Sequence, residues 1–513
     1  MKKQLASTAT SLKNCNKMTS AYQKMLALWG EVSDLDNANS VLRWDQETYM
    51  PAKGATARGK IISTLTGMRH AKLNAPELRA AIDDALTEVE ESSIEHAQVL
   101  RAQKKVNEAN CIPADLATAI AEAESNGLVA WQNARKESDF SLFESQLIAL
   151  VKLNREKAAA LDPDSPAYDV MLNLYEEGVT EAQLVPIFDE LRGELAPLIK
   201  AANAAAPVDE SCAMGNFSAD AQRDFAMLIA KKMGYDTEAG RLDKTTHPFC
   251  TTFGAGDVRI TWRWLDDDFR SGLSGVMHEA GHALYEQGFS SDLARTPLFN
   301  ATGLGMHESQ SRLWENMVGR SAGFWEWAMP HFRTAFPEQA HCSVEQMVKA
   351  QNTSRPSLIR VEADEATYNL HVAVRFEIER KLFSNQVEVG DLPELWDNTY
   401  RELLGVSADN VADGVLQDIH WAMGAFGYFP TYSLGNIICA QLYKAAEAEL
   451  GDLQAPFAKG DFAPLLGWLR SNIHQHGNRY STFELLKRAT GEELCAGPLL
   501  EHLKDRVSSA YGL

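Results

Sequence analysis

Apolar residues recur at three- and four-residue spacing along most of the chain, with charged residues between them. This periodicity is typical of helices that bury one face. The breaks are short, as in AspProAspSerPro at 162–166, and no repeat, low-complexity segment or long linker divides the chain. We therefore expect residues 1–513 to form a single, mainly α-helical domain whose two lobes flank a deep cleft. The predicted helices cover 20–32, 76–110, 112–160, 180–205, 219–234, 308–330, 364–387, 435–450 and 482–491.

One segment departs from the helical pattern. Between Asp257 and Trp264 apolar and polar residues alternate, which is typical of a strand with two different faces. The preceding PheGlyAlaGlyAsp at 253–257 predicts a hairpin turn. It does not fit a phosphate-binding loop, because such a loop leads into a helix and this one leads into a strand. We therefore expect a small β-hairpin within a helical protein.

Composition limits the classes of function. The 513 residues include 49 Lys and Arg against 70 Asp and Glu, and the net charge of −21 comes with no basic run that would bind nucleic acid. No window is apolar enough for a membrane span, and the stretch at 7–11 is polar where a signal peptide would be apolar. The seven cysteines are odd in number and form no CxxC pair, which favours a reducing compartment over a disulfide framework. These features predict a cytoplasmic protein with no membrane or nucleic-acid partner.

The clearest chemical motif is HisGluAlaGlyHis at 278–282. In a helix, His278 and His282 lie one turn apart on the same face, so both imidazoles can bind one zinc ion. Glu279 points away from that face by about a third of a turn, close enough to act on a water at the metal. The alternative is an ordinary helix that carries two histidines without a metal.

A catalytic zinc site needs a third protein ligand. Glu286 lies about 12 Å along the helix from His278, which is too far. HisGluSerGln at 307–310 opens another helical stretch, and either Glu308 or His307 could complete the site. Residue chemistry favours Glu308, although a glutamate at the start of a helix also stabilises the helix dipole without binding any metal.

With these motifs in view, the sequence resembles the M32 metallocarboxypeptidases of the carboxypeptidase Taq type. Beyond HExxH, its segments match the family's DxRxT, HES/GQ, IRxxAD and GxxQDxHW motifs in order over most of the chain. The matching segments are 257–261, 307–310, 359–364 and 414–421, with TrpAspGln at 44–46, MetPro at 50–51 and HisProPhe at 247–249 also similar. The resemblance implies that Glu308 is the third zinc ligand.

The resemblance also implies a fold and an activity. The fold would be a helical zincin clam like those of neurolysin and the angiotensin-converting enzymes, with a small sheet beside the active-site helix and the zinc site within about 245–435. The activity would be removal of single C-terminal residues from peptides, with broad specificity and poor cleavage near proline. A homodimer is implied, with one Zn²⁺ per chain and Co²⁺ as a possible substitute.

The site residues divide by role. Glu279 is the expected general base, and Arg360 of the IRxxAD segment is the expected partner of the substrate's terminal carboxylate, because a guanidinium can hold a carboxylate by two parallel hydrogen bonds. Without the family match, an arginine at such a position is more often ion-paired at the surface. His420 and Tyr432 are expected to donate to the tetrahedral oxyanion.

Further candidates surround these residues. Tyr428 competes with Tyr432 for its role, and either tyrosine could simply belong to the core. His247 is a candidate contact for the substrate carbonyl, although a histidine before proline can merely cap a turn. The strand that carries Arg259 could bind the substrate backbone as an edge strand, or could be an ordinary hairpin. Three residues are expected to support the site from behind. Asp364 could orient Arg360 or cap the next helix, and Gln417 and Asp418 are expected to steady a metal ligand or His420.

Four other functions fit parts of the sequence. A zinc endo-oligopeptidase or a peptidyl-dipeptidase would use the same scaffold and differ in the distance from the metal to the carboxylate-binding arginine. An inactive peptide-binding scaffold would have no need of Glu279. A cysteine peptidase would need a Cys–His dyad, and no cysteine here has a supporting motif.

Overall fold

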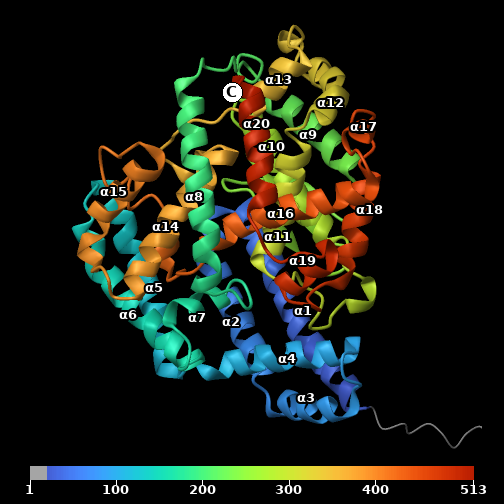
Figure 1. Ribbon diagram of the computed structural model, residues 1–513. Coiled ribbons are helices and arrows are strands. Elements are labelled where there is room, and N and C mark those ends of the chain that lie inside the picture. Colours follow the sequence, from blue (N-terminus) through green and yellow to red (C-terminus); the bar gives the residue numbers. More distant parts are fainter. Residues whose placement is uncertain (1–19) are drawn as a thin grey trace, which may run out of the picture.

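The computed structural model describes residues 20–513, which are mostly helical (Figure 1). The first four helices share a hydrophobic core of their own, formed by residues such as Met25, Ile82 and Val99. In Figure 1 they are drawn in blue at the bottom of the molecule. They are α1 (Ala21–Thr48), α2 (Ala55–Leu73), α3 (Pro76–Glu88) and α4 (Ile94–Cys111).

The remaining helices surround a second, larger core. Before the sheet come α5 (Ala114–Glu137), α6 (Ser141–Leu161), α7 (Ala167–Asn173), α8 (Glu181–Ala204) and α9 (Ala219–Met233). After it come α10 (Phe269–Glu286), α11 (Leu304–Arg312), α12 (Ala322–Ala335), α13 (Val344–Gln351), α14 (Glu365–Phe383) and α15 (Leu392–Leu404). The last are α16 (Pro430–Leu450), α17 (Gln454–Phe457), α18 (Ala463–Asn472), α19 (Thr482–Thr490) and α20 (Gly497–Tyr511).

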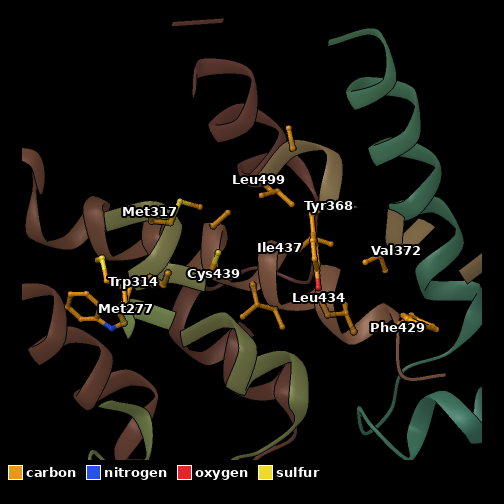
Figure 2. Close-up of a cluster of buried hydrophobic side chains, with 14 of the residues drawn as sticks. Met277, Trp314, Met317, Tyr368, Val372, Phe429, Leu434, Ile437, Cys439 and Leu499 are labelled. Atoms are coloured by element: carbon orange, nitrogen blue, oxygen red, sulfur yellow. The ribbon is translucent and has the colours of Figure 1, made fainter. Parts of the chain in front are cut away.

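Helix α16 runs through the middle of this core. Every residue from 433 to 442 is buried, which is expected of a helix enclosed on all sides rather than along one stripe. Figure 2 shows its side chains Leu434, Ile437 and Cys439 among residues from several other elements. Those neighbours include Trp314, Met317, Tyr368, Val372 and Leu499. The active-site helices described below therefore pack around a helix that is itself fully enclosed in the core.

The predicted helices exist, but two of the long ones are each divided in two. The stretch 112–160 breaks at Ser138, whose φ of 51° places it in the left-handed conformation that ends α5. The stretch 76–110 breaks after α3, and Ser93 starts α4 by accepting a hydrogen bond from the backbone N–H of His96. A third, 308–330, contains a π-helical turn at Leu313–Val318 between α11 and α12. Periodicity alone does not reveal such breaks, because the apolar spacing continues across them.

The sheet has three strands in the order β1-β3-β2, formed by β1 (Leu242–Lys244), β2 (Cys250–Thr252) and β3 (Val258–Trp262). The predicted hairpin is confirmed, since β2 pairs antiparallel with β3 across the turn at 253–257. β1 pairs with β3 in parallel, with Leu242 opposite Ile260. β3 is therefore the central strand, and the expectation that it offers a free edge to a peptide is wrong. Because both of its sides are hydrogen-bonded, only β1 and β2 have open edges within this sheet.

The cysteines differ in part from expectation. Cys212 and Cys342 form a disulfide, whereas the sequence predicted none. The cysteine spacing did not predict this pair, because 130 residues separate the two and neither belongs to a motif. Cys111, Cys250, Cys439 and Cys495 are free, while Cys15 and the polar stretch at 7–11 lie outside the described residues. No helix within residues 20–513 is long and apolar enough to cross a membrane.

Candidate active site

The HisGluAlaGlyHis motif lies on α10, which begins where Asp268 accepts a hydrogen bond from the backbone N–H of Arg270. Met277, Ala280 and Leu284 are fully buried on this helix and fix its orientation against the core. Gly281 allows α11 to come close, because a Cβ at this position would lie 2.6 Å from the carbonyl oxygen of Gln310. The glycine within the motif therefore has a packing role: it lets the two site-bearing helices meet.

A metal ion could be held by His278, His282 and Glu308, whose ligand atoms all lie within 4.8 Å of one another. Among the described residues, no other group of three or more His, Cys, Asp or Glu side chains could hold one. The Nε2 atoms of both histidines lie 3.5 Å from the same oxygen of Glu308, Oε2. Two imidazoles and one carboxylate are the ligand set of many catalytic zinc sites. Gly435 of α16 makes room for Glu308, since a Cβ there would lie 2.4 Å from the Glu308 Cγ.

The outer nitrogens of the two histidines are also held in place. His278 Nδ1 lies 2.9 Å from an oxygen of Glu315, and His282 Nδ1 lies 2.9 Å from the backbone oxygen of His307. With Nδ1–H donating to these acceptors, each Nε2 carries its lone pair toward Glu308, as metal binding requires. The π-helical turn brings Glu315 to this side, in keeping with the frequent use of such turns at functional sites. The residues present therefore fit a divalent metal ion.

His307, the rival third ligand, has a different environment. Its ring stacks on His282 at 4.3 Å between centroids, and its Nε2 lies 2.8 Å from Glu286 Oε1. Its side chain is thus paired with the carboxylate at the end of α10 and is not among the group that could hold a metal. Glu286, excluded from metal binding by its distance along the helix, has this pairing instead.

Two glutamates of the site differ in charge state. Burial raises the pKa of Glu279 to about 7, and the nearby Glu308 adds to the effect against the opposing influence of His278. Burial also disfavours ionisation of Glu308, but Arg312 and the two histidines outweigh it and hold the pKa of Glu308 well below its usual range. Arg312 Nε donates to Glu308 at 2.7 Å. One carboxyl group is thus permanently charged, while the other can exchange a proton near neutral pH.

A cavity of about 460 Å³ adjoins the metal-binding group and includes His278 and Glu308 in its wall. Arg360 lies in the same wall and is only 5% exposed. Its Nε and Nη2 donate to Asp418 Oδ1 at 3.1 and 2.9 Å, and its Nη1 donates to the hydroxyl of Tyr368 at 2.9 Å. The backbone N–H of Arg360 donates to Gln417 Oε1 at 3.1 Å. Gln417 and Asp418 therefore support Arg360, whereas the sequence led us to expect that they steady a metal ligand or His420.

Asp418 joins Arg360 to a second arginine. Arg375, which is completely buried, donates to Asp418 Oδ2 from Nε and Nη2 at 2.8 and 2.7 Å. Burial alone would raise the pKa of Asp418, but Arg375 and Arg360 outweigh it and lower this pKa below its usual range. The ionised carboxylate thus fixes the orientation of the Arg360 guanidinium.

His420 and Tyr432 lie together near this cavity. His420 Nε2 is 3.3 Å from the Tyr432 hydroxyl, and Tyr432 contributes to the cavity wall. Burial lowers the pKa of His420 to about 4, so its ring is neutral near pH 7. Tyr428 packs against both, with ring centroids 5.2 Å from His420 and 5.4 Å from Tyr432, but it does not contribute to the cavity wall. Of the two tyrosines, Tyr432 is therefore the one placed to meet a ligand there.

The chain matches the family model described as Carboxypeptidase Taq (M32) metallopeptidase over residues 24–507. It belongs to the M32 family. It is 42% identical over 509 residues to Thermostable carboxypeptidase 1 of Thermus thermophilus, an alignment that covers 96% of this chain and 99% of that protein. Carboxypeptidase 1 of Bacillus subtilis is 37% identical over 490 residues, covering 94% and 96%. The crystal structure of the M32 carboxypeptidase from Deinococcus radiodurans R1 superposes with a TM-score of 0.94 at 39% identity, covering 96% and 100%.

Membership of M32 confirms several expectations. The protein is a metallocarboxypeptidase, an enzyme whose family implies a divalent metal ion and peptide substrates. The mainly helical fold, with a small sheet beside the active-site helix, agrees with the expected zincin class. The division into two lobes stays a prediction.

Three further residues of the M32 segments were candidates for the site, and only one of them lines the cavity. His247 contributes to the cavity wall, and its contact with the substrate carbonyl stays a prediction. Arg259 does not: its guanidinium is paired with Asp257 at 2.8 Å and lies over the rings of Trp44 and Phe253. Its role within the described residues is to join the sheet to α1, so the expectation of a substrate contact is not supported by its position. Asp364 caps α14 by accepting from the backbone N–H groups of Ala366 and Thr367 and does not orient Arg360.

The sequence did not single out four residues that support the site. Arg312 and Glu315 follow Glu308 at four and seven residues, so helical spacing could have placed them on its face. Tyr368 and Arg375 lie on α14, where they contact Arg360 and Asp418. Nothing in their sequence context separates them from other residues of a long helix.

Proposed function

We propose that this metallocarboxypeptidase uses zinc to hydrolyse the last peptide bond of its substrates and releases C-terminal residues one at a time. The observation that supports this most strongly is the position of Arg360 in the same cavity wall as His278 and Glu308. A guanidinium there can hold the terminal carboxylate while the adjacent peptide bond lies at the metal.

The hydrogen bonds of Arg360 support this role. A guanidinium has five N–H donors, and three of them are used by Asp418 and Tyr368. The remaining two lie one on each Nη nitrogen, which is the arrangement that a carboxylate accepts by two parallel bonds. Tyr368 and Asp418 thus orient the arginine and leave its outer edge available for substrate.

The hydrolysis itself needs an activated water and a proton for the leaving amine. A zinc ion held by His278, His282 and Glu308 would supply Lewis acidity toward the scissile carbonyl and the attacking water. Glu279 takes the proton of that water and delivers it to the departing nitrogen. Its pKa of about 7 suits both steps, because a group that titrates near the working pH can accept and return a proton.

The oxyanion of the tetrahedral intermediate needs donors as well. His420 and Tyr432 are the proposed donors, and their mutual distance of 3.3 Å lets them act on one oxygen. Burial raises the pKa of Tyr432, so its hydroxyl keeps its proton and can donate. His247 is proposed to contact the substrate carbonyl from the same cavity.

The finer properties rest on the resemblance to the M32 family. We expect Zn²⁺ as the metal with Co²⁺ able to replace it, broad specificity with poor cleavage near proline, and a homodimer. A cytoplasmic location is expected from the composition and the polar stretch at 7–11 instead. An endo-oligopeptidase or peptidyl-dipeptidase on the same scaffold is the second candidate, and it differs in where the cut falls relative to Arg360.

The proposal is tested with an N-blocked dipeptide that carries a free carboxylate. Purified protein is stripped of metal with a chelator, and Zn²⁺, Co²⁺ or Mg²⁺ is added back at equal concentration. We expect hydrolysis to return with Zn²⁺ and Co²⁺, and to stay absent in Glu279→Gln at the same metal content. Hydrolysis that persists after the metal is removed would refute the proposed mechanism.

A further inference from the structure

Glu379 of α14 is a carboxylate with no exposed surface. It accepts three hydrogen bonds: from the Trp421 indole N–H at 2.8 Å, from the Tyr168 hydroxyl at 2.9 Å and from the backbone N–H of Gly427 at 2.9 Å. A buried carboxylate is costly unless its oxygens are satisfied, so such a set of donors is a specific arrangement. Two of the three donors belong to the segment between α15 and α16.

That segment carries His420 and Tyr428, and Glu379 holds the two residues next to them, between His420 and Tyr428 along the chain. Trp421 directly follows His420, and Gly427 directly precedes Tyr428. Gly427 has a φ of 82° and comes so close to α7 that a Cβ would lie 2.7 Å from the Met171 carbonyl carbon, so its position leaves little freedom.

The same face of α14 makes the other contacts with this part of the site. Tyr368 accepts from Arg360, Arg375 pairs with Asp418, and Glu379 holds Trp421 and Gly427. The three residues follow one another at spacings of seven and four, which places them on one side of the helix. One helix face therefore orients the carboxylate-binding arginine at one end and the segment of His420 at the other.

We propose that Glu379 is a positioning residue for the reaction: it holds the segment 420–428 so that His420 and, through it, Tyr432 face the scissile carbonyl. The inference deepens the proposed function and rests on the role assigned there to His420. Glu379 itself lies in the core, where it reaches neither the cavity wall nor the metal-binding group. Its effect on the reaction passes through the segment that it holds.

Glu379→Gln tests this with almost no change in volume. An amide offers one acceptor oxygen, so its NH₂ group must face at least one of the N–H donors of Trp421 and Gly427. Since a displacement of about 1 Å at a reacting group can cost about 100-fold in rate, we expect kcat to fall about 10- to 100-fold. KM and metal content should stay near the wild-type values, because Arg360 and the metal-binding group are held by other contacts.

Tyr168→Phe is the matched control. It removes the one hydrogen bond to Glu379 that does not involve the segment 420–428, and it keeps the ring that packs on Phe376 and Phe383. We expect its kcat to stay within about 3-fold of the wild type, because the hydrogen bonds by which Glu379 holds Trp421 and Gly427 remain. An equal fall of kcat in Tyr168→Phe and Glu379→Gln would overturn the proposal, since it would point to general loss of core stability.

A double-mutant cycle with His420→Ala separates positioning from stability. If Glu379 acts through His420, Glu379→Gln should lower kcat at most 2-fold further in the His420→Ala background. Independent, multiplying effects, or an unchanged kcat in Glu379→Gln alone, would refute the inference. If Glu379→Gln does not fold, Trp421→Phe removes the indole donor on the segment instead, and the double-mutant cycle with His420→Ala is carried out on that variant.

The proposed function is tested separately by His420→Ala alone. A wild-type kcat in that variant would refute the catalytic role of His420 and, with it, the route by which Glu379 acts. A large loss in His420→Ala with an unchanged Glu379→Gln would leave the proposed function intact and refute only the inference.

Discussion

Replacing Arg360 by methionine should remove the preference for substrates with a free C-terminal carboxylate. Its effect on the hydrolytic step itself should be smaller. The side chain is 5% exposed, and two of its N–H donors remain for a carboxylate after Asp418 and Tyr368 are satisfied. A hydrogen bond to a charged group contributes about 1.5–3 kcal/mol, so losing two costs at least about 3 kcal/mol. At 1.36 kcal/mol for each factor of ten, kcat/KM should fall about 100-fold or more.

The assay compares one blocked peptide in two forms, with a free carboxylate and with a C-terminal amide. We expect Arg360→Met to lower kcat/KM for the acid and to leave the already slow amide nearly unchanged, so that the ratio of the two approaches one. Arg263→Met is the matched control, because Arg263 contributes to the same cavity wall and should not change this ratio. Equal losses of kcat/KM on both substrates, which leave the ratio unchanged in Arg360→Met, would refute the assignment of Arg360 to the carboxylate site.

Three other predictions follow from the site and its surroundings. Glu279→Gln should lower kcat by about 100- to 10,000-fold at unchanged zinc affinity, measured by chelator competition, because the residue moves protons and binds no metal. Glu315→Gln should weaken zinc binding about 10- to 100-fold, by the same measurement, because its carboxylate orients His278. Burial raises the pKa of Glu176 to about 7. The contribution of this group to the free energy of unfolding is therefore fully present below about pH 4.5 and is lost as pH rises through 7. The free energy of unfolding of Glu176→Gln, measured by thermal unfolding, should therefore decline less between pH 5 and 8 than that of the wild type, by up to about 3 kcal/mol. Parallel curves of this free energy against pH for the two proteins would contradict the prediction.

The sequence predicted the fold class because helix formation leaves a repeating pattern, and here the pattern runs along most of the chain. It did not predict where long helices break, since Ser138 ends a helix by its backbone conformation and Ser93 starts one by a side-chain hydrogen bond, while the apolar spacing continues past both. The central position of β3 was also missed. Periodicity identifies a strand with two faces, but the three-residue β1 that covers one of its edges is too short to leave a pattern.

Much of the candidate site could be predicted because its residues belong to motifs with helical spacing. His278 and His282 are one turn apart, and Glu308 follows on the next helix. The supporting residues could not be found in the same way. Arg375 meets Asp418 across 43 positions and Glu379 meets Gly427 across 48, and contacts at such separation depend on how the helices pack.

The products formed from an unmodified octapeptide show whether single residues leave from the C-terminus. Mass spectrometry over time should show a ladder of peptides shortened by one residue at each step, with free amino acids as the only small product. The ladder should be absent for the amidated octapeptide. Dipeptide release would contradict the placement of Arg360 one residue from the cut, and internal fragments from the amidated peptide would contradict carboxypeptidase action altogether.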